Sequence, residues 1–261
     1  MDSTGKTLRF GNLTGDDGKA VVVAMDHGVH AGPMDGIRNL EATVGSIVDA
    51  GADGVILNPG GVRRVADRLA GDVGVVVRVD GSGTVTADEG ARPYAAVDVE
   101  RALALGADAV VAMGYLESGI EADSLSLLGD LANDCSRHEL PLIAEMLPTE
   151  RAGEPEAVEL AARVGAELGA DLVKTYYTGD HASFRRIAEA TPVGVVVLGG
   201  SKRESTRAVL ADIEAAVEAG AVGVAMGRNV WGVEDPAGMV AALRAIVHDD
   251  ASVDAALEHL A

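Results

Sequence analysis

The chain has 261 residues, of which 48% are hydrophobic and only 3% aromatic, so any core must be built from Val, Ala, Leu and Ile. Its 41 acidic residues outnumber the 21 basic ones and give a net charge of −20, which argues against a nucleic-acid partner because phosphate binding needs a basic face. Two explanations of this lysine-poor, acidic surface stay open: a halophile-like adaptation to a salty cytosol, or an ordinary acidic protein.

Neither a disulfide nor a membrane span is expected. Cys135 is the only cysteine, no apolar run approaches the roughly 18 residues of a transmembrane helix, and residues 1–10 lack the apolar core of a signal peptide. We therefore expect a soluble, cytoplasmic protein with no membrane partner.

Short runs rich in Val, Ala and Ile recur along the chain, separated by stretches with helical spacing. In residues 212–220, for example, Ile213, Ala216 and Val217 fall on one helical face. Continuous apolar strands that alternate with helices indicate a parallel sheet covered on both faces. The eight predicted strands are 20–25, 54–58, 74–80, 109–113, 141–146, 171–175, 193–198 and 222–226.

A short motif repeats where a helix should end and a strand begin. The segments AGADGV (50–55), LGADAV (105–110), LGADLV (168–173) and AGAVGV (219–224) each place a glycine at the helix end. Eight βα units in this length predict an α/β fold, a single (β/α)8 TIM barrel over residues 1–261, with residues 1–19 as an N-terminal extension. A doubly wound open sheet is disfavoured because no Gly-x-Gly-x-x-Gly motif follows a strand.

Active sites of such barrels lie at the C-terminal ends of the strands, so the polar residues there are the candidates. They are Asp26, His27 and His30 after the first strand, Arg78 and Asp80 at the third, Tyr115 after the fourth, Glu145 in the fifth, and Lys174 and Tyr176 at the sixth.

The alternation of side chains along a strand predicts which candidates face the barrel interior. Glu145 shares a face with Ile143 and Leu147, and the opposite face must pack against helices, where an unpaired carboxylate would be costly. Glu145 should therefore point into the barrel mouth, and the same parity directs Lys174 and Asp26 inward.

Lys174, one of four lysines, lies at the end of a buried apolar run. Removal from water disfavours the charged form of an amine, and a free amine attacks a carbonyl to form an iminium, which can draw electrons from a breaking or forming C–C bond. This chemistry needs a general acid/base, for which the candidates are Asp26, Glu145, Tyr115 and Tyr176. The alternative, of equal weight, is that Lys174 only forms a buried ion pair with Asp26 or Glu145.

The loops after the last two strands have the composition of a phosphate site. Both leave their strands through glycines, which expose backbone N–H groups, and an arginine adds positive charge. The predicted phosphate contacts are Gly199, Gly200, Ser201, Gly227 and Arg228. The alternative is that the glycines only make tight turns.

A metal site is the weaker hypothesis. Asp26, His27 and His30 form a D-H-x-x-H cluster, but adjacent residues of a strand point apart, and no other histidine lies at a strand end. We therefore expect neither a metal nor another cofactor.

Several motifs together resemble one known family. They are MDHG after the first strand with GP soon after, ADLVKTYYTGD at the sixth, VVVLGGSK at the seventh, GAVGVAMGRNVW at the eighth, and the tail IVHDDASVDAAL. The chain resembles the archaeal-type class I fructose-bisphosphate aldolases, a family that includes 2-amino-3,7-dideoxy-D-threo-hept-6-ulosonate synthase and the autoinducer-2 phosphate thiolase.

The resemblance implies a (β/α)8 barrel that forms a Schiff base without metal. It assigns imine formation to Lys174, matches the family's first-strand aspartate to Asp26, and matches the phosphate-binding residues to Gly199, Gly200, Gly227 and Arg228. It also implies a homo-oligomer, for which a decamer built from pentamers is one option.

The sequence departs from the family after the fifth strand. There the aldolases carry a tyrosine, followed by Pro-Arg-Gly, that donates and accepts protons, but here Leu147 takes its place. Arg78 likewise replaces the lysine of the third strand. We predict Glu145 as the replacement acid/base, with a pKa raised by apolar surroundings, and Tyr115 and Tyr176 as further candidates.

The sequence thus predicts an enzyme, a metal-independent class I aldolase and carbon–carbon lyase, acting on a phosphorylated small-molecule carbonyl, with a fructose-bisphosphate-like ketose as the leading substrate. His27 and Arg78 are expected to contact the substrate. The alternatives are the heptulosonate synthase, which is a transaldolase, a thiolase-like acyl transfer, or a barrel that binds a phosphate ligand without forming an imine.

Overall fold

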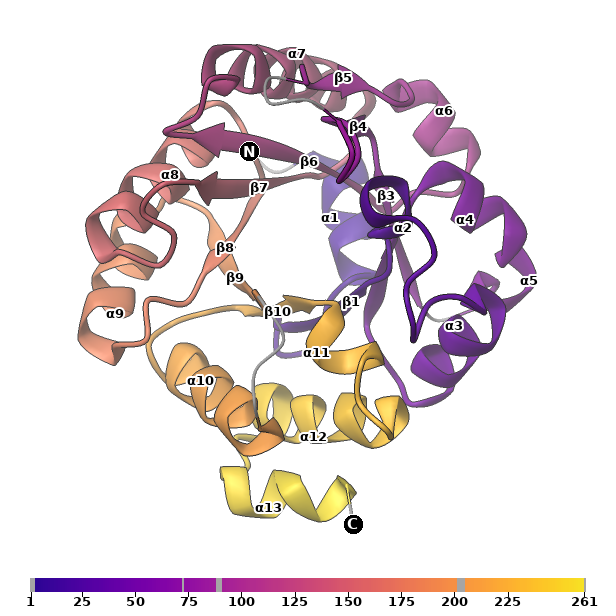
Figure 1. Cartoon of the computed structure of the whole chain (residues 1–261), viewed down its shortest axis with the longest axis vertical. Helices are drawn as coiled ribbons and strands as arrows, with labels where there is room; N and C mark the ends of the chain where they lie inside the picture. Colours follow the sequence, from indigo (N-terminus) through magenta and orange to yellow (C-terminus); the bar gives the residue numbers. More distant parts are fainter. Residues whose placement is uncertain (1–2, 72, 88–90, 201–204, 261) are drawn as a thin grey trace.

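The computed structural model describes residues 3–71, 73–87, 91–200 and 205–260, within which eight parallel strands close into a barrel (Figure 1). The barrel confirms the predicted (β/α)8 fold, and the open sheet is excluded because β1 pairs with both β2 and β10. In barrel order the strands are β1 (Ala20–Ala24), β2 (Gly54–Leu57), β3 (Gly74–Arg78), β6 (Ala109–Leu116), β7 (Leu142–Pro148), β8 (Leu172–Tyr176), β9 (Gly194–Leu198) and β10 (Gly223–Met226).

Helices surround the barrel on its outside (Figure 1). As predicted, Ile213 and Ala216 are on the buried face of their helix, α10. The covering helices are α3 (Leu40–Asp49), α4 (Pro59–Arg64), α5 (Ala66–Leu69), α6 (Val99–Ala104), α7 (Glu121–His138), α8 (Pro155–Glu167), α9 (His181–Ala190), α10 (Thr206–Glu218) and α12 (Pro236–Asp249), followed by α13 (Val253–Leu257) and η1 (Glu258–Leu260).

Two layers of apolar side chains fill the structure. A small cluster inside the barrel includes Val22, Ile56, Val76 and Ile143, and a larger one lies between the strands and the helices. The side chains alternate between these layers along each strand, which is the pattern expected of a closed parallel barrel. Among the described residues, no helix is both long and apolar enough to cross a membrane.

The repeated helix-to-strand motif forms the turn that its glycines predict. All four glycines adopt left-handed backbone conformations, with φ between +81° and +107°, so a side chain there would be strained. In three of the four repeats an aspartate follows, and one of its carboxylate oxygens accepts an N–H from a neighbouring strand at 2.6–2.9 Å. The pairs are Asp53 with Val21, Asp108 with Val75, and Asp171 with Leu142.

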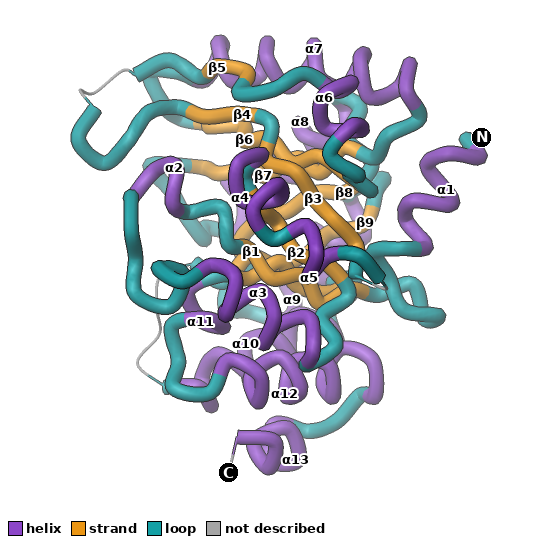
Figure 2. The backbone as a smooth tube through the Cα atoms, turned by 90° about the vertical axis from the view of Figure 1, so that its right-hand side faces the viewer, coloured by secondary structure: helices purple, strands orange, loops and turns teal. Residues whose placement is uncertain are grey.

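The N-terminal extension closes the bottom of the barrel. Helix α1 (Thr4–Gly11) lies at the end opposite helix α2 (Gly28–Ala31) and the small hairpin of β4 (Asp80–Gly81) and β5 (Tyr94–Ala95), as Figure 2 shows. Leu13 is 3% exposed and belongs to the apolar cluster inside the barrel. A Cβ at Gly74 would lie 2.5 Å from the carbonyl oxygen of Asn12, so this close approach requires glycine.

The N-terminal extension also contacts the second carboxylate oxygen of two of these aspartates. Lys6 Nζ lies 2.6 Å from Asp171 Oδ1, and Asn12 Nδ2 donates to Asp108 Oδ1 at 2.7 Å. The third aspartate, Asp53, receives a guanidinium N–H from Arg244 of α12 at 2.7 Å. The bottom face is thus held by polar contacts, and the candidate catalytic residues lie at the other end.

Candidate active site

A buried ionic cluster lies inside the barrel mouth, with Arg78 at its centre. Its guanidinium donates from Nε to Asp26 Oδ2 at 2.8 Å, from one terminal nitrogen to Asp80 Oδ1 at 3.2 Å, and from the other to Glu145 Oε2. All four side chains belong to residues no more than 7% exposed. Arginine suits this position because its donors form a fixed planar fork that can hold several carboxylates at once.

Lys174 joins the cluster from the strand next to Glu145. The two residues are partners in the register of β7 and β8, and Lys174 Nζ lies 2.8 Å from Glu145 Oε1. Residues paired across neighbouring parallel strands face the same side, so both point into the barrel, as parity predicted. The ion pair that we considered as the alternative role of Lys174 is therefore present, and it is the contact that holds the amine.

The carboxylates nearest the two cations stay ionised. Burial alone would raise the pKa of Asp26, but Arg78, His27 and Lys174 hold it far below its usual value. Burial opposes ionisation of Glu145 as well, yet the positive charges of Lys174 and Arg78 leave its pKa below the ordinary 4.5. The prediction that apolar surroundings raise the pKa of Glu145 is therefore wrong, because its neighbours are cations from β3 and β8.

Asp80 differs from the other two carboxylates. It follows β3 and is 2% exposed, and this burial raises its pKa despite the contact with Arg78 and an N–H from Met113 at 3.0 Å. The pKa of the Arg78 guanidinium itself is raised above its already high ordinary value, because the charges of Asp26, Glu145 and Asp80 outweigh the cost of burial. Arg78 is thus a permanent cation whose donors hold Asp26 and Glu145 in place.

Two residues further along the strands, toward the mouth of the barrel, the next inward-facing positions are occupied by two tyrosines and a leucine. Tyr115 on β6 pairs in register with Leu147 on β7, and Tyr176 lies two residues beyond Lys174 on β8. All three residues are half-buried. The two predicted tyrosines therefore flank Leu147, which occupies the position of the family's tyrosine.

The loops after β9 and β10 come together as predicted for a phosphate site. Arg228 donates to the carbonyl of Gly200 at 2.9 Å, and Asn229 donates to the carbonyl of Gly199 at 2.6 Å. The Nε of Arg228 is buried with no hydrogen-bond partner among the described residues, so one donor is left for a ligand. Ser201, the remaining predicted contact, lies outside the described residues.

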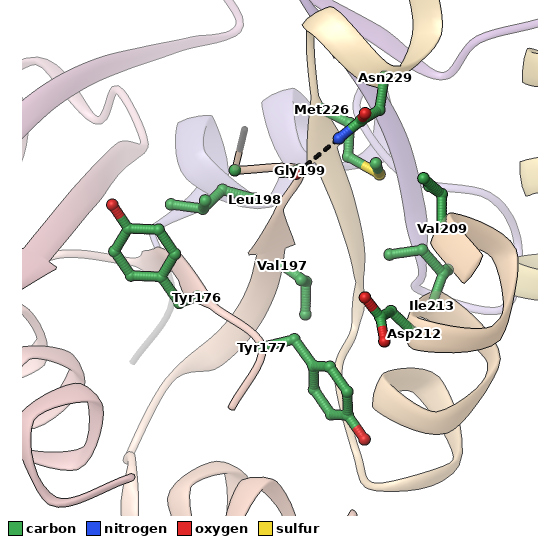
Figure 3. Close-up of a pocket in the computed structure, with 11 residues that line it drawn as sticks. Tyr176, Tyr177, Val197, Leu198, Gly199, Val209, Asp212, Ile213, Met226 and Asn229 are labelled. Carbon is green, nitrogen blue, oxygen red and sulfur yellow. Dashed lines mark hydrogen bonds between the residues drawn. The ribbon is translucent and has the colours of Figure 1, made fainter. Parts of the chain in front are cut away.

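A pocket of about 260 Å³ lies beside these loops (Figure 3). Gly199 and Tyr176 border it, but Val197 and Ile213 show that it extends outward between β9 and α10. Neither Lys174 nor Glu145 lines it. We place the chemistry at the buried ionic cluster rather than in this pocket, because Lys174 and the carboxylates of Asp26 and Glu145 lie there.

His27 lies close to the cluster, against expectation. We expected Asp26 and His27 to point apart as neighbours on a strand, but β1 ends at Ala24, and the helical backbone of His27 brings its Nδ1 to 3.5 Å from Asp26 Oδ1. Its ring packs edge-on against Trp231, with 5.3 Å between centroids. A Cβ at Gly227 would lie 2.5 Å from this ring, so the glycine permits the contact.

His30, the last member of the D-H-x-x-H cluster, lies away from Asp26 and His27. His30 is exposed, and its Nδ1 lies 3.1 Å from the carbonyl oxygen of Gly83. Among the described residues, no group of three or more His, Cys, Asp or Glu side chains is arranged to hold a metal ion.

Sequence reasoning missed three residues at the site. Ser82 Oγ lies 2.8 Å from the hydroxyl of Tyr115, Met113 Sδ lies 2.6 Å from the same hydroxyl, and Trp231 donates to the carbonyl of Ala24 at 2.9 Å. Strand parity could have found Met113, which is two residues before Tyr115. Nothing in the sequence signals Ser82, because the hairpin that carries it is only two residues per strand.

Comparison with known proteins places these features in context. The model of the DeoC/LacD family aldolases matches residues 20–232. A 2-amino-3,7-dideoxy-D-threo-hept-6-ulosonate synthase of Halobacterium salinarum is 38% identical, over 98% of this chain and 97% of that one. A class 1 fructose-bisphosphate aldolase of Thermoproteus tenax is 34% identical, over 93% and 94% respectively.

A solved structure shares the whole barrel. It is a Schiff base forming fructose-1,6-bisphosphate aldolase, 33% identical in sequence, with a TM-score of 0.85 over 93% of this chain and all of that one.

Proposed function

The chain belongs to the DeoC/LacD family of aldolases, and on this basis we propose that it makes or breaks a C–C bond in a phosphorylated ketose through an imine on Lys174. The class I aldolase predicted from the sequence, a carbon–carbon lyase, is confirmed by the family match and the aldolase relatives. The observation that carries the assignment to Lys174 is its 2.8 Å contact with Glu145 inside the barrel mouth.

The pair of Lys174 and Glu145 offers a route to the free amine. A proton that moves from Nζ to the carboxylate Oε1 leaves a neutral amine and a neutral acid, so the net charge of the buried cluster does not change. The amine then attacks the ketone carbon, and loss of water gives an iminium whose positive charge lies beside Glu145, Asp26 and Arg78. We propose Glu145 as the base that activates the lysine.

Asp26 and Arg78 serve this arrangement in different ways. Asp26 stays ionised at neutral pH, so its carboxylate stabilises the iminium and can accept a hydrogen bond from a substrate hydroxyl. Arg78 uses its donors on three carboxylates, so we assign it to positioning them rather than to binding the substrate directly. His27 remains a proposed substrate contact at the edge of the cluster.

The substrate phosphate is proposed to bind at the loops after β9 and β10. Gly199, Gly200 and Gly227 offer backbone N–H groups there, and Arg228 has a buried Nε without a partner among the described residues. Of the two strands, β9 lies next to β8, which carries Lys174. A phosphate held there would direct the reacting carbons of the ketose away from β9 and toward β7 and β6.

Two substrates deserve testing within this class. Fructose 1,6-bisphosphate remains the leading candidate, and the 2-amino-heptulosonate synthase reaction is the second, because a relative of that name is 38% identical over nearly the whole chain. A cytoplasmic location, a homo-oligomer and a salt-adapted surface stay predictions.

The test is reductive trapping. The protein is incubated with borohydride and, in turn, fructose 1,6-bisphosphate, fructose 1-phosphate and dihydroxyacetone phosphate, and the modified residue is located by peptide mass spectrometry. We expect a stable adduct on Lys174 with at least one ketose phosphate. An adduct on Lys6, Lys19 or Lys202 would show that another lysine forms the imine, and no adduct with any of the three compounds would support a barrel that binds phosphate without an imine.

A further inference from the structure

We propose that the hydroxyl of Tyr115 is the group that exchanges a proton with the substrate oxygen at the reacting carbon, in place of the tyrosine that Leu147 replaces. This inference rests on the proposed function and assigns the proton transfer that Glu145 cannot complete. Glu145 is engaged by two cations, so the carboxylate that activates Lys174 is poorly suited to donate a proton to a substrate alkoxide as well.

The register of β6 against β7 places Tyr115 at the same height in the barrel as Leu147. Tyr115 on β6 is the direct partner of Leu147 on β7, so their side chains point to the same side at the same height. Adjacent strands are separated by about 4.8 Å, a distance that a tyrosine side chain can span. In the structure the hydroxyl of Tyr115 lies beside Ser82, so a rotation of the side chain, without a shift of the backbone, would bring the phenol toward the space in front of Leu147.

The proposed orientation of the substrate favours Tyr115 over Tyr176 as the proton donor. Lys174 on β8 has the phosphate loops of β9 and β10 on one side and β7 with β6 on the other. Tyr176 lies on β8 itself, two residues beyond Lys174, where the charges of both Glu145 and Arg228 act on it. Tyr115 lies on the far side of β7 from β8, and in the proposed orientation of the substrate it is on the side of the carbons that react.

The hydrogen bonds of Tyr115 leave its proton available. Its hydroxyl lies 2.8 Å from Ser82 Oγ and 2.6 Å from Met113 Sδ. If Ser82 donates to the phenol oxygen, the phenolic proton points at a thioether, which is a weak acceptor. A substrate alkoxide would accept that proton far more strongly than the sulfur of Met113 does.

In the direction of synthesis, each proton that moves in this step has a donor and an acceptor. The enamine on Lys174 attacks the aldehyde carbon, a C–C bond forms, and the enamine nitrogen becomes an iminium. The aldehyde oxygen takes the proton of Tyr115, the phenolate takes the proton of Ser82, and half-buried Ser82 is reprotonated by solvent water. Burial raises the pKa of Tyr115, so the phenol is protonated at neutral pH and acts as the acid in this direction.

The experiment compares four proteins: wild type, Tyr115→Phe, Tyr177→Phe and the double variant Tyr115→Phe with Leu147→Tyr. Tyr177 is the matched control, since its ring packs against Phe184 with centroids 5.4 Å apart, on the side away from the cluster. Turnover is measured with fructose 1,6-bisphosphate and, in synthesis, with dihydroxyacetone phosphate plus an aldehyde. Borohydride trapping with dihydroxyacetone phosphate reports imine formation separately.

We expect Tyr115→Phe to lower turnover by about 10²-fold or more, the usual contribution of a general acid/base, while the adduct on Lys174 still forms. Tyr177→Phe should stay within a few fold of wild type, and Leu147→Tyr should restore at least part of the lost turnover. Normal turnover in Tyr115→Phe, loss of trapping along with turnover, or no recovery in the double variant would each overturn the assignment. Absence of trapping in the wild type would instead refute the proposed function.

Discussion

Glu145 and Lys174 face each other across two adjacent strands, with 2.8 Å between carboxylate and amine, and Arg78 donates to the other oxygen of the same carboxylate. One carboxylate thus joins the nucleophile to a permanent cation. The contact explains how a lysine that is only 4% exposed can be kept inside a barrel, because the carboxylate offsets the cost of burying its charge.

Replacing Lys174 by arginine should abolish catalysis and leave the fold intact. Arginine keeps the positive charge beside Glu145 but cannot form an imine, so both turnover and borohydride trapping should be lost, with an unchanged circular dichroism spectrum. Lys19→Arg is the matched control, because Lys19 pairs with Asp250 outside the site. An adduct that persists in Lys174→Arg would show that a different lysine reacts.

Removal of metal ions should not affect turnover. In the proposed mechanism an iminium withdraws the electrons for which other aldolases need a Lewis acid. Activity should survive prolonged dialysis against EDTA, measured against an aliquot dialysed without chelator. Activity that falls and returns on addition of zinc would favour the hypothesis that Asp26, His27 and His30 bind a catalytic metal.

Glu145→Gln should slow the formation of the imine. The amide keeps the shape of the side chain but cannot take the proton of Lys174, so we expect turnover to fall by about 10²-fold or more and trapping to become slower without disappearing. Rapid-quench trapping at several times measures this rate directly. A variant that traps as fast as the wild type would show that another group, with Asp26 the first candidate, activates the lysine.

The pH dependence of Glu145 gives a second test of the same pair. Because the pKa of Glu145 in the folded protein lies below the ordinary 4.5, its ionised form stabilises the fold fully above about pH 4.5 and progressively less as the pH falls through the folded value. The free energy of unfolding should therefore drop below pH 4.5 by less in Glu145→Gln than in the wild type. Equal drops in the two proteins would mean that other carboxylates dominate.

Added salt should stabilise the protein. With a net charge of −20, self-repulsion among surface carboxylates opposes folding, and it weakens as the Debye length falls from about 10 Å at 0.1 M salt to about 3 Å at 1 M. The melting temperature should rise with potassium chloride over this range. Sucrose in place of salt controls for solvent exclusion, and an unchanged melting temperature in salt would favour an ordinary acidic protein.

The sequence was sufficient to predict the barrel and the inward direction of its key side chains. The apolar runs are long enough for strands, the glycine turns recur at the helix ends, and the period of two along each strand places Glu145 and Lys174 inside. These features are local, because each depends on residues close together in the chain.

Side-chain contacts between strands that are far apart in the sequence could not be predicted in the same way. The central position of Arg78 depends on a long side chain that reaches across from β3 to β7. The lowered pKa of Glu145 depends on the positive charge of Lys174 from β8 and then on that of Arg78. The pairing of Tyr115 with Leu147 likewise needs the register of β6 against β7. Asp26 and His27 do not point apart, because both lie beyond the end of β1 and His27 has helical backbone angles.

The three repeated aspartates at the base have a consequence for how the molecule can change. Each fixes the start of a strand from below and takes its second partner from α1, the segment after it or α12, so the alignment of the strands does not depend on the loops at the mouth. Substitutions at the mouth, such as the leucine at position 147 near the end of β7, can therefore alter the chemistry without shifting one strand against the next. A shortened N-terminus would have the reverse effect: the catalytic groups would all remain present, but the frame that sets their spacing would loosen from the base.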